Sequence, residues 1–152
     1  MQNLFIYHIL IDRFAGQIKP DRKLNEFLGG NIRGIISKLD YLKELGVDVL
    51  WLSPFYETNQ YHGYHITNFE KPDSRFGNIQ DLKELVDAAH HKSMQIIADF
   101  VPNHCSVNHP FFRDALQNSA STYRKWFYFD KHNQYRSFLY FKEIPKINLD
   151  YQ

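Results

Sequence analysis

Three short runs of apolar residues stand out along the chain, each with the length of a β-strand. They cover residues 4–11, 47–52 and 94–101. Continuous runs of this kind are typical of strands that are buried on both faces of a parallel sheet. Polar residues follow each run: Asp12 and Arg13 after the first, Ser53 after the second, and Asn103 and His104 after the third. We therefore predict three buried strands with hydrogen-bonding groups at their carboxyl ends.

The stretches between these runs have helical spacing. From Ile32 to Leu45, apolar residues recur every three or four positions, and Gly46 follows where such a helix would end. Asn78 is a suitable N-cap for a second helix that extends to Ala89. Strands joined by helices form right-handed crossovers, which make successive strands parallel and adjacent. The sequence therefore predicts a βαβαβ unit of the α/β class.

The pattern changes after His104. Two short helices are expected, at 110–116 and 122–127, and the rest of this part is aromatic, polar and poorly periodic. No low-complexity linker separates it from the preceding residues, which favours a long insertion after the third strand over a second domain. We predict that residues 1–104 hold three β/α units and that residues 105–152 begin the insertion.

Composition supports a globular protein and excludes several classes of function. The 152 residues are 43% hydrophobic and 16% aromatic, which is enough for a substantial core. The formal net charge is +1 and no block of basic residues occurs, so nucleic-acid binding is not expected. No apolar stretch approaches the roughly 20 residues of a membrane-spanning helix, and the first residues lack the pattern of a signal peptide. Together with a single cysteine, Cys105, these features predict a cytoplasmic protein without membrane partners.

The polar groups at the strand ends indicate a binding site. Because the carboxyl ends of parallel strands meet at one edge of a sheet, the groups that follow the three runs should converge. The loop after the second run adds Tyr61, His62 and Tyr64, and Gly63 between them permits close backbone approach. Aromatic faces bordered by hydrogen-bonding groups suit a sugar ring, whose CH face stacks while its hydroxyls need partners. A carbohydrate pocket is the resulting hypothesis.

Two other interpretations of these residues have less support. His62, His65 and His104 could form a zinc site, but they lack the close helical spacing of zinc ligands, so no metal site is predicted. Asp99 could be a general base. Its position inside an apolar strand favours instead a supporting role, in which it orients a neighbour through a buried charge pair with an arginine supplied elsewhere.

Several short segments form a recognisable set of motifs. They are Ile6–Ile9 with Asp12–Phe14, Gly29–Ile35, Lys38–Leu42, Trp51–Pro54, Tyr61–Tyr64, Asp99–His104 and Ile144–Asn148. In this order they resemble the α-amylase family of glycoside hydrolases, which act on α-glucans through an eight-stranded TIM barrel. The last segment is most similar to its form in neopullulanases and cyclomaltodextrinases. The resemblance spans nearly the whole chain and implies a partial TIM (β/α)8 barrel: the first three parallel strands, their helices, and a long insertion after strand three.

The resemblance also implies roles for five residues. Tyr64 would stack on the sugar beside the cleaved bond, and His62 and His104 would hydrogen-bond the same glucose. Asp99 would support the catalytic centre. Asn103 would brace its loop or, in calcium-dependent members of the family, ligate calcium. No other cofactor is implied.

The resemblance stops at Gln152, before a fourth strand. The family's aspartate nucleophile, its glutamate acid/base and its second catalytic aspartate therefore have no counterpart here, and no pair of carboxyl groups is nominated as catalytic. We expect an N-terminal fragment of an enzyme that cleaves α-glucosidic bonds of starch-like glucans or maltooligosaccharides, inactive by itself and dependent on the missing part of the barrel. The alternatives are a non-catalytic carbohydrate-binding remnant and a self-contained doubly wound domain with an unrelated ligand.

Overall fold

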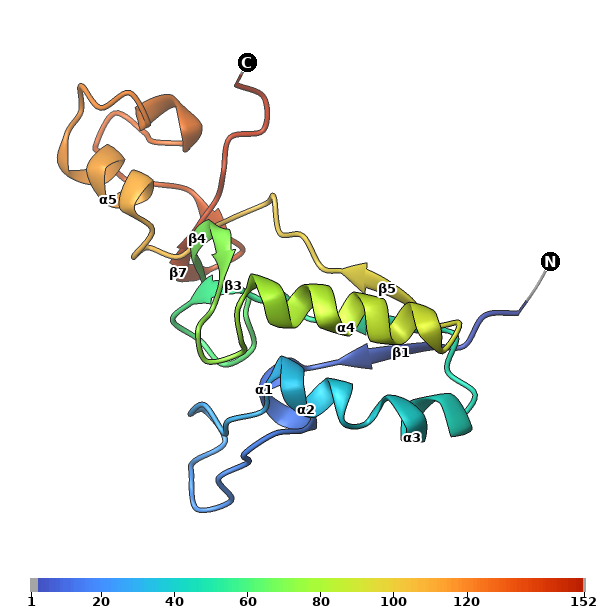
Figure 1. Cartoon of the computed structure of the whole chain (residues 1–152). Coiled ribbons are helices and arrows are strands. Elements are labelled where there is room, and N and C mark those ends of the chain that lie inside the picture. Colours follow the sequence, from blue (N-terminus) through green and yellow to red (C-terminus); the bar gives the residue numbers. More distant parts are fainter. Residues whose placement is uncertain (1–2, 152) are drawn as a thin grey trace.

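The three predicted strands lie side by side in one parallel sheet of the computed structural model, which describes residues 3–151. They are β1 (Ile6–Ile9), β2 (Val49–Leu52) and β5 (Gln95–Ala98), in the order β1-β2-β5. Leu52 pairs with Ile9 on one side and with Ala98 on the other, so the three carboxyl ends are level. Strands that are adjacent and parallel in chain order confirm the predicted fold class (Figure 1).

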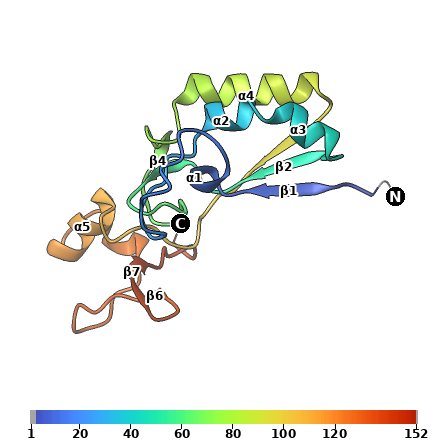
Figure 2. The ribbon, with the colours of Figure 1, turned by 90° about the horizontal axis from the view of Figure 1, so that it is seen from below.

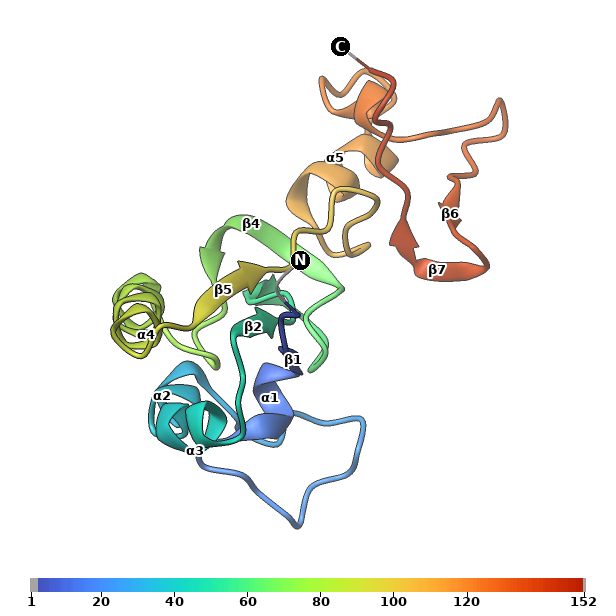
Figure 3. The ribbon, with the colours of Figure 1, turned by 90° about the vertical axis from the view of Figure 1, so that its right-hand side faces the viewer.

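Three helices cover one face of this sheet. α2 (Ile32–Ile36) and α3 (Leu39–Glu44) connect β1 to β2, and α4 (Ile79–His91) connects β2 to β5. Figures 2 and 3 show all three helices on the same side of the strands, as crossovers of one hand require. The core between helices and sheet is apolar and includes Ile9, Ile35, Leu42, Leu50 and Leu85, all at most 1% exposed.

The opposite face of the sheet is also mainly apolar, with His8 and Gln95 as its polar members. Ile6, Trp51 and Ile97 alternate with the core residues along their strands and keep 48%, 39% and 45% of their surface exposed. In a TIM barrel this face is the inner wall, which layers of side chains fill. The strand runs are therefore apolar on both faces because each face has a packing role.

The helix predicted over residues 32–45 is two helices in the structure. The break falls at Ser37, whose hydroxyl donates a 2.7 Å hydrogen bond to the Gly34 carbonyl, an acceptor that a continuing helix would use itself. Gly46 follows α3 with a φ of +89°, which confirms it as the end of the second helix.

Other predicted elements differ mainly at their ends. Asn78 caps α4 as predicted, and its side chain accepts two backbone hydrogen bonds from the first turn. The third strand ends at Ala98 rather than at Val101, because its neighbour β2 ends at Leu52 and offers no further partner. The first run is shorter for another reason: its last residue begins the short helix α1 (Ile11–Phe14).

A hairpin that the sequence pattern did not predict lies between β2 and α4. Its strands β3 (Tyr56–Thr58) and β4 (Ile66–Pro72) are antiparallel, with two shifts of register. Figure 1 places this hairpin at the carboxyl ends of the parallel strands. The hairpin therefore brings its loop, residues 59–65, to the edge where the sequence predicts a site.

The residues after β5 build a second cluster of elements beyond the same edge (Figure 1). They comprise α5 (Pro110–Gln117), the 3-10 turn η1 (Arg124–Trp126), and a hairpin of β6 (Ser137–Phe138) and β7 (Phe141–Pro145). The helix predicted at 110–116 is confirmed, whereas the one predicted at 122–127 is only the turn η1. A small core of Cys105, Phe112, Ala115 and Phe127 holds this part together. None of the helices in residues 3–151 has the length and hydropathy that crossing a membrane requires.

Candidate functional site

A hydrogen bond joins the hairpin loop to the end of β5. The Tyr64 hydroxyl, from the loop between β3 and β4, donates to Asp99 Oδ2 at 2.6 Å. Burial of the ring, together with the hydrogen bond to Asp99 and the charge of that carboxylate, raises the pKa of Tyr64 to about 12. Tyr64 therefore remains a hydrogen-bond donor throughout the physiological pH range, and Asp99 fixes the position of its ring.

His104 lies against the backbone of the same loop. Its Nε2 is 3.2 Å from the Tyr64 carbonyl oxygen, and its Nδ1 is 3.0 Å from the side-chain nitrogen of Asn103. Since an amide nitrogen can only donate, Nδ1 accepts and the proton of the neutral ring lies on Nε2. Burial lowers the pKa of His104, which favours this neutral form. A sugar hydroxyl that reaches Nε2 would share its proton with the Tyr64 carbonyl.

His62 differs from His104 in that its Nε2 proton is not engaged by another residue of the described chain. Its Nδ1 accepts a 3.1 Å hydrogen bond from the Tyr64 backbone N–H, so the ring proton lies on Nε2. Burial, with smaller contributions from His65 and His104, lowers the pKa of His62 to about 4. No hydrogen bond occupies Nε2 within residues 3–151, and a neutral imidazole N–H is therefore free for a ligand.

Gly63 determines how the loop sits against the end of β2. Its φ is +85°, and a Cβ at this position would lie 2.1 Å from the backbone oxygen of Pro54. Only glycine fits such an approach. This bears out the expectation that Gly63 allows close backbone contact.

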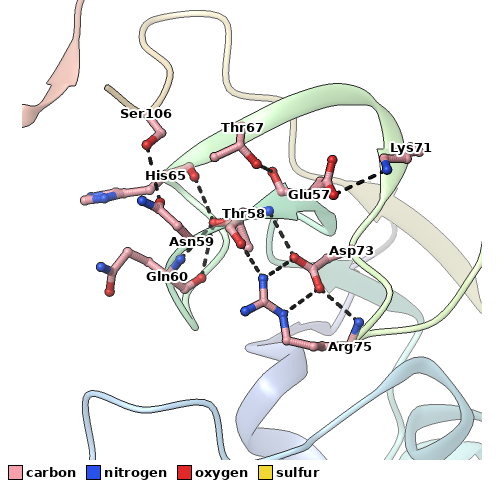
Figure 4. A network of polar contacts seen from close by, with 10 residues as sticks. All are labelled: Glu57, Thr58, Asn59, Gln60, His65, Thr67, Lys71, Asp73, Arg75 and Ser106. Atoms are coloured by element: carbon pink, nitrogen blue, oxygen red, sulfur yellow. Dashed lines mark hydrogen bonds and ion pairs between the residues drawn. The ribbon is translucent and has the colours of Figure 1, made fainter. Parts of the chain in front are cut away.

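The base of the hairpin is fastened by a buried carboxylate (Figure 4). Asp73 is 1% exposed and accepts hydrogen bonds from Arg75 Nε at 2.7 Å and from the Thr58 backbone N–H at 3.0 Å. Burial opposes the charge, but the hydrogen bonds from Arg75 and Thr58 outweigh it and hold the pKa of Asp73 below its usual range. The loop is thus held on a rigid support.

A second connection ties the hairpin to the segment that carries His104. The Ser106 backbone N–H donates to the Ile66 carbonyl at 2.8 Å, and the Ser106 hydroxyl contacts Asn59 Oδ1 at 3.4 Å (Figure 4). The two loops that supply the candidate residues therefore form one unit rather than two independent segments.

Two residues that sequence reasoning did not assign also touch the site. The Arg13 guanidinium lies over the Tyr61 ring at 3.9 Å, and Tyr61 meets His62 edge-on at 5.2 Å between ring centroids. Phe138 stacks on His104, with ring centroids 5.2 Å apart and planes 28° apart. Arg13 is one of the groups that the sequence placed at the converging strand ends, without a role, but nothing local in the sequence points to Phe138.

The five residues named from the sequence lie together. Tyr64 and His62 belong to the loop of residues 59–65, and His104 contacts the backbone of that loop. Asp99 accepts a hydrogen bond from Tyr64, and Asn103 donates one to His104. Their individual roles toward a sugar stay predictions. The expected arginine partner of Asp99 stays a prediction: none of the ion pairs formed within residues 3–151 includes Asp99, and within this part of the chain its carboxylate accepts from the Tyr64 hydroxyl.

The calcium role expected for Asn103 in the complete domain stays a prediction. Within the described part of the chain, no three histidine, cysteine, aspartate or glutamate side chains gather as metal ligands. The Asn103 side-chain nitrogen contacts His104 Nδ1. No step derived below depends on calcium.

An apolar cavity of about 530 Å³ lies on the other side of the segment that follows β5. Its lining includes Phe69, Phe100, Phe111 and Trp126, and none of the five candidate residues contributes to it. The hydrogen-bonding groups that a sugar needs are gathered at Tyr64 instead, which makes the loop region the better candidate site.

Comparison with known proteins gives a consistent result. The family profile "Alpha amylase, catalytic domain" matches residues 8–147. Alpha-amylase 2 of Dictyoglomus thermophilum is 45% identical over 147 residues, which are 95% of this chain and 26% of that protein. Among solved structures, the type III pullulan hydrolase from Thermococcus kodakarensis matches with a TM-score of 0.87 at 30% identity, covering 99% of this chain and 33% of that one. A cyclomaltodextrinase matches with a TM-score of 0.86 at 28% identity, covering 98% and 29%. The chain thus spans about a quarter to a third of the length of these proteins.

Proposed function

The chain belongs to the α-amylase catalytic-domain family, and on that premise we propose that it forms the glucose-holding wall of an enzyme that cleaves α-glucosidic bonds. The proposed substrates are starch-like glucans or maltooligosaccharides. The observation that carries the proposal is the single hydrogen-bonded unit of Tyr64, Asp99, His62 and His104 at the carboxyl ends of the strands. This is the edge at which TIM-barrel enzymes place their active sites.

In this proposal the aromatic ring and the two imidazoles divide the work of holding one glucose. The Tyr64 face stacks on the CH face of the sugar, and Asp99 keeps the ring in place through the tyrosine hydroxyl. The neutral His62 donates its Nε2 proton to a sugar hydroxyl. His104 supplies a second donor next to it, and Asn103 holds the His104 ring. Glucose is thereby fixed before its bond is attacked, which is a large part of catalysis by orientation.

The proposal assigns no bond cleavage to the 152 residues alone. A retaining glycosidase needs a nucleophilic carboxylate and an acid/base carboxyl group about 5 Å apart. Asp99 is the one carboxylate among the four residues of this unit, and its Oδ2 already accepts a hydrogen bond from the Tyr64 hydroxyl. We therefore assign the reacting carboxyl groups to other parts of the complete protein. No cofactor is needed for this chemistry.

The test compares three proteins on maltotriose: the full-length protein that carries this chain, its Y64A variant, and a Y41A control. Tyr41 is an exposed tyrosine on α3, far from the loop. We expect glucose release by the full-length protein, a fall in kcat/KM of about tenfold or more in Y64A, and no change in Y41A. The isolated segment should release nothing. Absence of hydrolysis by the full-length protein, or equal kcat/KM in all three, would refute the proposal.

Calorimetry on the same proteins separates the alternative function. Binding of maltotriose without any hydrolysis by the full-length protein would favour a non-catalytic carbohydrate-binding remnant. A cytoplasmic location is also proposed. Its support is the buried Cys105, which forms no disulfide within the described chain, and cell fractionation tests it.

A further inference from the structure

A separate cavity adjoins the proposed glucose site on the far side of His104. It has a volume of about 490 Å³ and is bordered by Asn103 and by residues of the β6–β7 hairpin and its neighbours. The other lining residues are Tyr135, Arg136, Ser137, Phe138, Leu139, Lys142 and Lys146. Its size is within the usual range for small-ligand sites, and the proposed function leaves it without a role.

The hairpin that lines this cavity is fixed in position next to the glucose site. The Ile147 backbone N–H donates to the Asn103 carbonyl at 2.9 Å, and the Lys146 N–H donates to the Arg136 carbonyl at 2.9 Å. Lys146 also forms a β-bridge with His104. The cavity therefore keeps a defined distance from the residues proposed to hold glucose.

One wall of the cavity is aromatic. Phe138 packs one part of its ring on His104 and remains 39% exposed. A partly exposed phenyl ring next to a sugar-binding histidine is a suitable surface for the CH face of a second sugar unit.

The polar part of the wall carries positive charge only. Arg136, Lys142 and Lys146 each contribute a cation, and no carboxylate lines the cavity. None of the three belongs to an ion pair within residues 3–151. Glu143 is close enough to Tyr135 to contribute to the raised pKa of that tyrosine, but it is not part of the lining.

This distribution discriminates between neutral and anionic ligands. Asn103, Ser137 and Tyr135 supply oxygens that can accept from a sugar hydroxyl, so the three cations, and not a lack of acceptors, set this lining apart from a site for a neutral sugar. Guanidinium and ammonium groups only donate. The anionic oxygens of a phosphate group accept, and they form short, strong hydrogen bonds with such cations. The lining therefore matches a phosphate better than a sugar without a charged group.

We infer that this cavity binds a phosphate group, with Arg136, Lys142 and Lys146 around the phosphate oxygens and Phe138 against the attached sugar. The phosphate is either free in solution or carried by a sugar. The inference rests on the proposed function only for the sugar that Phe138 contacts, because the cation cluster binds phosphate whether or not the protein cleaves glucans.

The experiment uses calorimetry on the full-length protein with three probes: inorganic phosphate, glucose 6-phosphate and glucose. The double variant R136Q/K142Q removes two cations from the cavity. K131Q removes an exposed lysine of the same insertion that does not line the cavity, and it serves as the matched control. F138A tests the aromatic wall, and circular dichroism confirms that each variant is folded.

We expect inorganic phosphate and glucose 6-phosphate to bind at least tenfold more tightly than glucose at low salt, and the double variant to lose about tenfold in affinity for both. K131Q should bind like the wild type. If F138A weakens only glucose 6-phosphate, the ligand is a sugar phosphate; if it changes neither affinity, the site takes free phosphate. Equal affinity for glucose and glucose 6-phosphate, or unchanged phosphate binding in the double variant, overturns the inference. Hydrolysis of maltotriose, measured on the same preparations, tests the proposed function separately.

Discussion

Tyr64 and Asp99 come from loops 35 positions apart, and the 2.6 Å hydrogen bond between them is the closest polar link between the hairpin and the parallel sheet at this edge. It gives each residue a different task. The tyrosine ring remains available to a ligand, while its hydroxyl is engaged below with the carboxylate. The two tasks can be separated by substitution, because phenylalanine retains the ring and loses the hydroxyl.

Y64F should therefore destabilise the protein while preserving much of its sugar affinity. Loss of the donor leaves a half-buried carboxylate with one hydrogen bond fewer, which costs about 1–3 kcal/mol in the free energy of unfolding. Maltotriose should bind Y64F more tightly than Y64A, because only Y64F keeps the stacking face. Thermal denaturation and calorimetry measure the two effects. Equal affinity of Y64F and Y64A for maltotriose would count against stacking by this ring.

His62 should contribute to the acid sensitivity of the fold. Its pKa is about 4 in the folded protein and about 6.5 in an unfolded chain. Between these values the unfolded state binds more protons, so stability contributed by His62 is complete above pH 6.5 and falls as the pH decreases toward 4. Below pH 4 both states are protonated and the contribution changes no further.

H62Q should accordingly show a shallower fall of Tm between pH 6.5 and pH 4 than the wild type. His65, His104 and His109, whose pKa values burial also lowers, supply the remaining slope. The exposed His132 provides a control, and H132Q should follow the wild-type curve. A wild-type slope in H62Q would show that this imidazole is not kept neutral by the fold.

Gly63 and Gly46 form a matched pair of positions for alanine substitution. Both have positive φ, +85° and +89°, so alanine is strained at each by about 1–2 kcal/mol. A Cβ at Gly46 meets no atom within 4 Å, whereas at Gly63 it meets the Pro54 carbonyl oxygen at 2.1 Å. G46A should therefore lower the free energy of unfolding by about the strain alone. G63A should lower it further and abolish maltotriose binding, because the loop must move. Similar unfolding curves for the two variants would contradict the close approach.

Asp73 should be far more important for stability than the exposed Glu57, although both carry carboxylates in the same hairpin. D73N removes the buried charge that accepts from Arg75, whose own side chain is 45% exposed, which costs about 1.5–3 kcal/mol. Glu57 Oε1 lies 3.3 Å from Lys71 Nζ in an ion pair that is open to solvent. E57Q should therefore change stability by less than about 1 kcal/mol. Urea denaturation of the two variants measures the difference. Equal midpoints would show that Asp73 does not fasten the hairpin.

The parallel sheet and α4 could be predicted because their signals are local. Continuous apolar runs and the N-cap Asn78 depend only on neighbouring residues, and both are found in the structure. The hairpin of β3 and β4 could not be predicted in this way. Its strands are short and out of simple register, and its stability depends on Asp73 reaching Thr58, fifteen positions earlier.

In the candidate site, too, some features could be predicted from local sequence and others depend on long-range contacts. The sequence indicated which side chains gather, because strand ends converge at one edge of a parallel sheet. It did not indicate that Asp99 accepts from the Tyr64 hydroxyl, since that contact depends on the path of the hairpin loop. Phe138 reaches His104 only through the fold of the insertion, and no pattern near either residue records that contact.

The fastening of the β3–β4 hairpin has an evolutionary consequence. Because Asp73, Arg75 and Thr58 hold its base, the tip residues Gln60 and His65, whose side chains make no hydrogen bond within residues 3–151, contribute little to the folding of the parallel strands. These two positions are free to diverge between descendants of a common ancestor without loss of the barrel, whereas His62, Gly63 and Tyr64 are held by their contacts in the site. New preferences among glucans are therefore expected to arise by replacement at the tip of this hairpin, while its base is inherited unchanged.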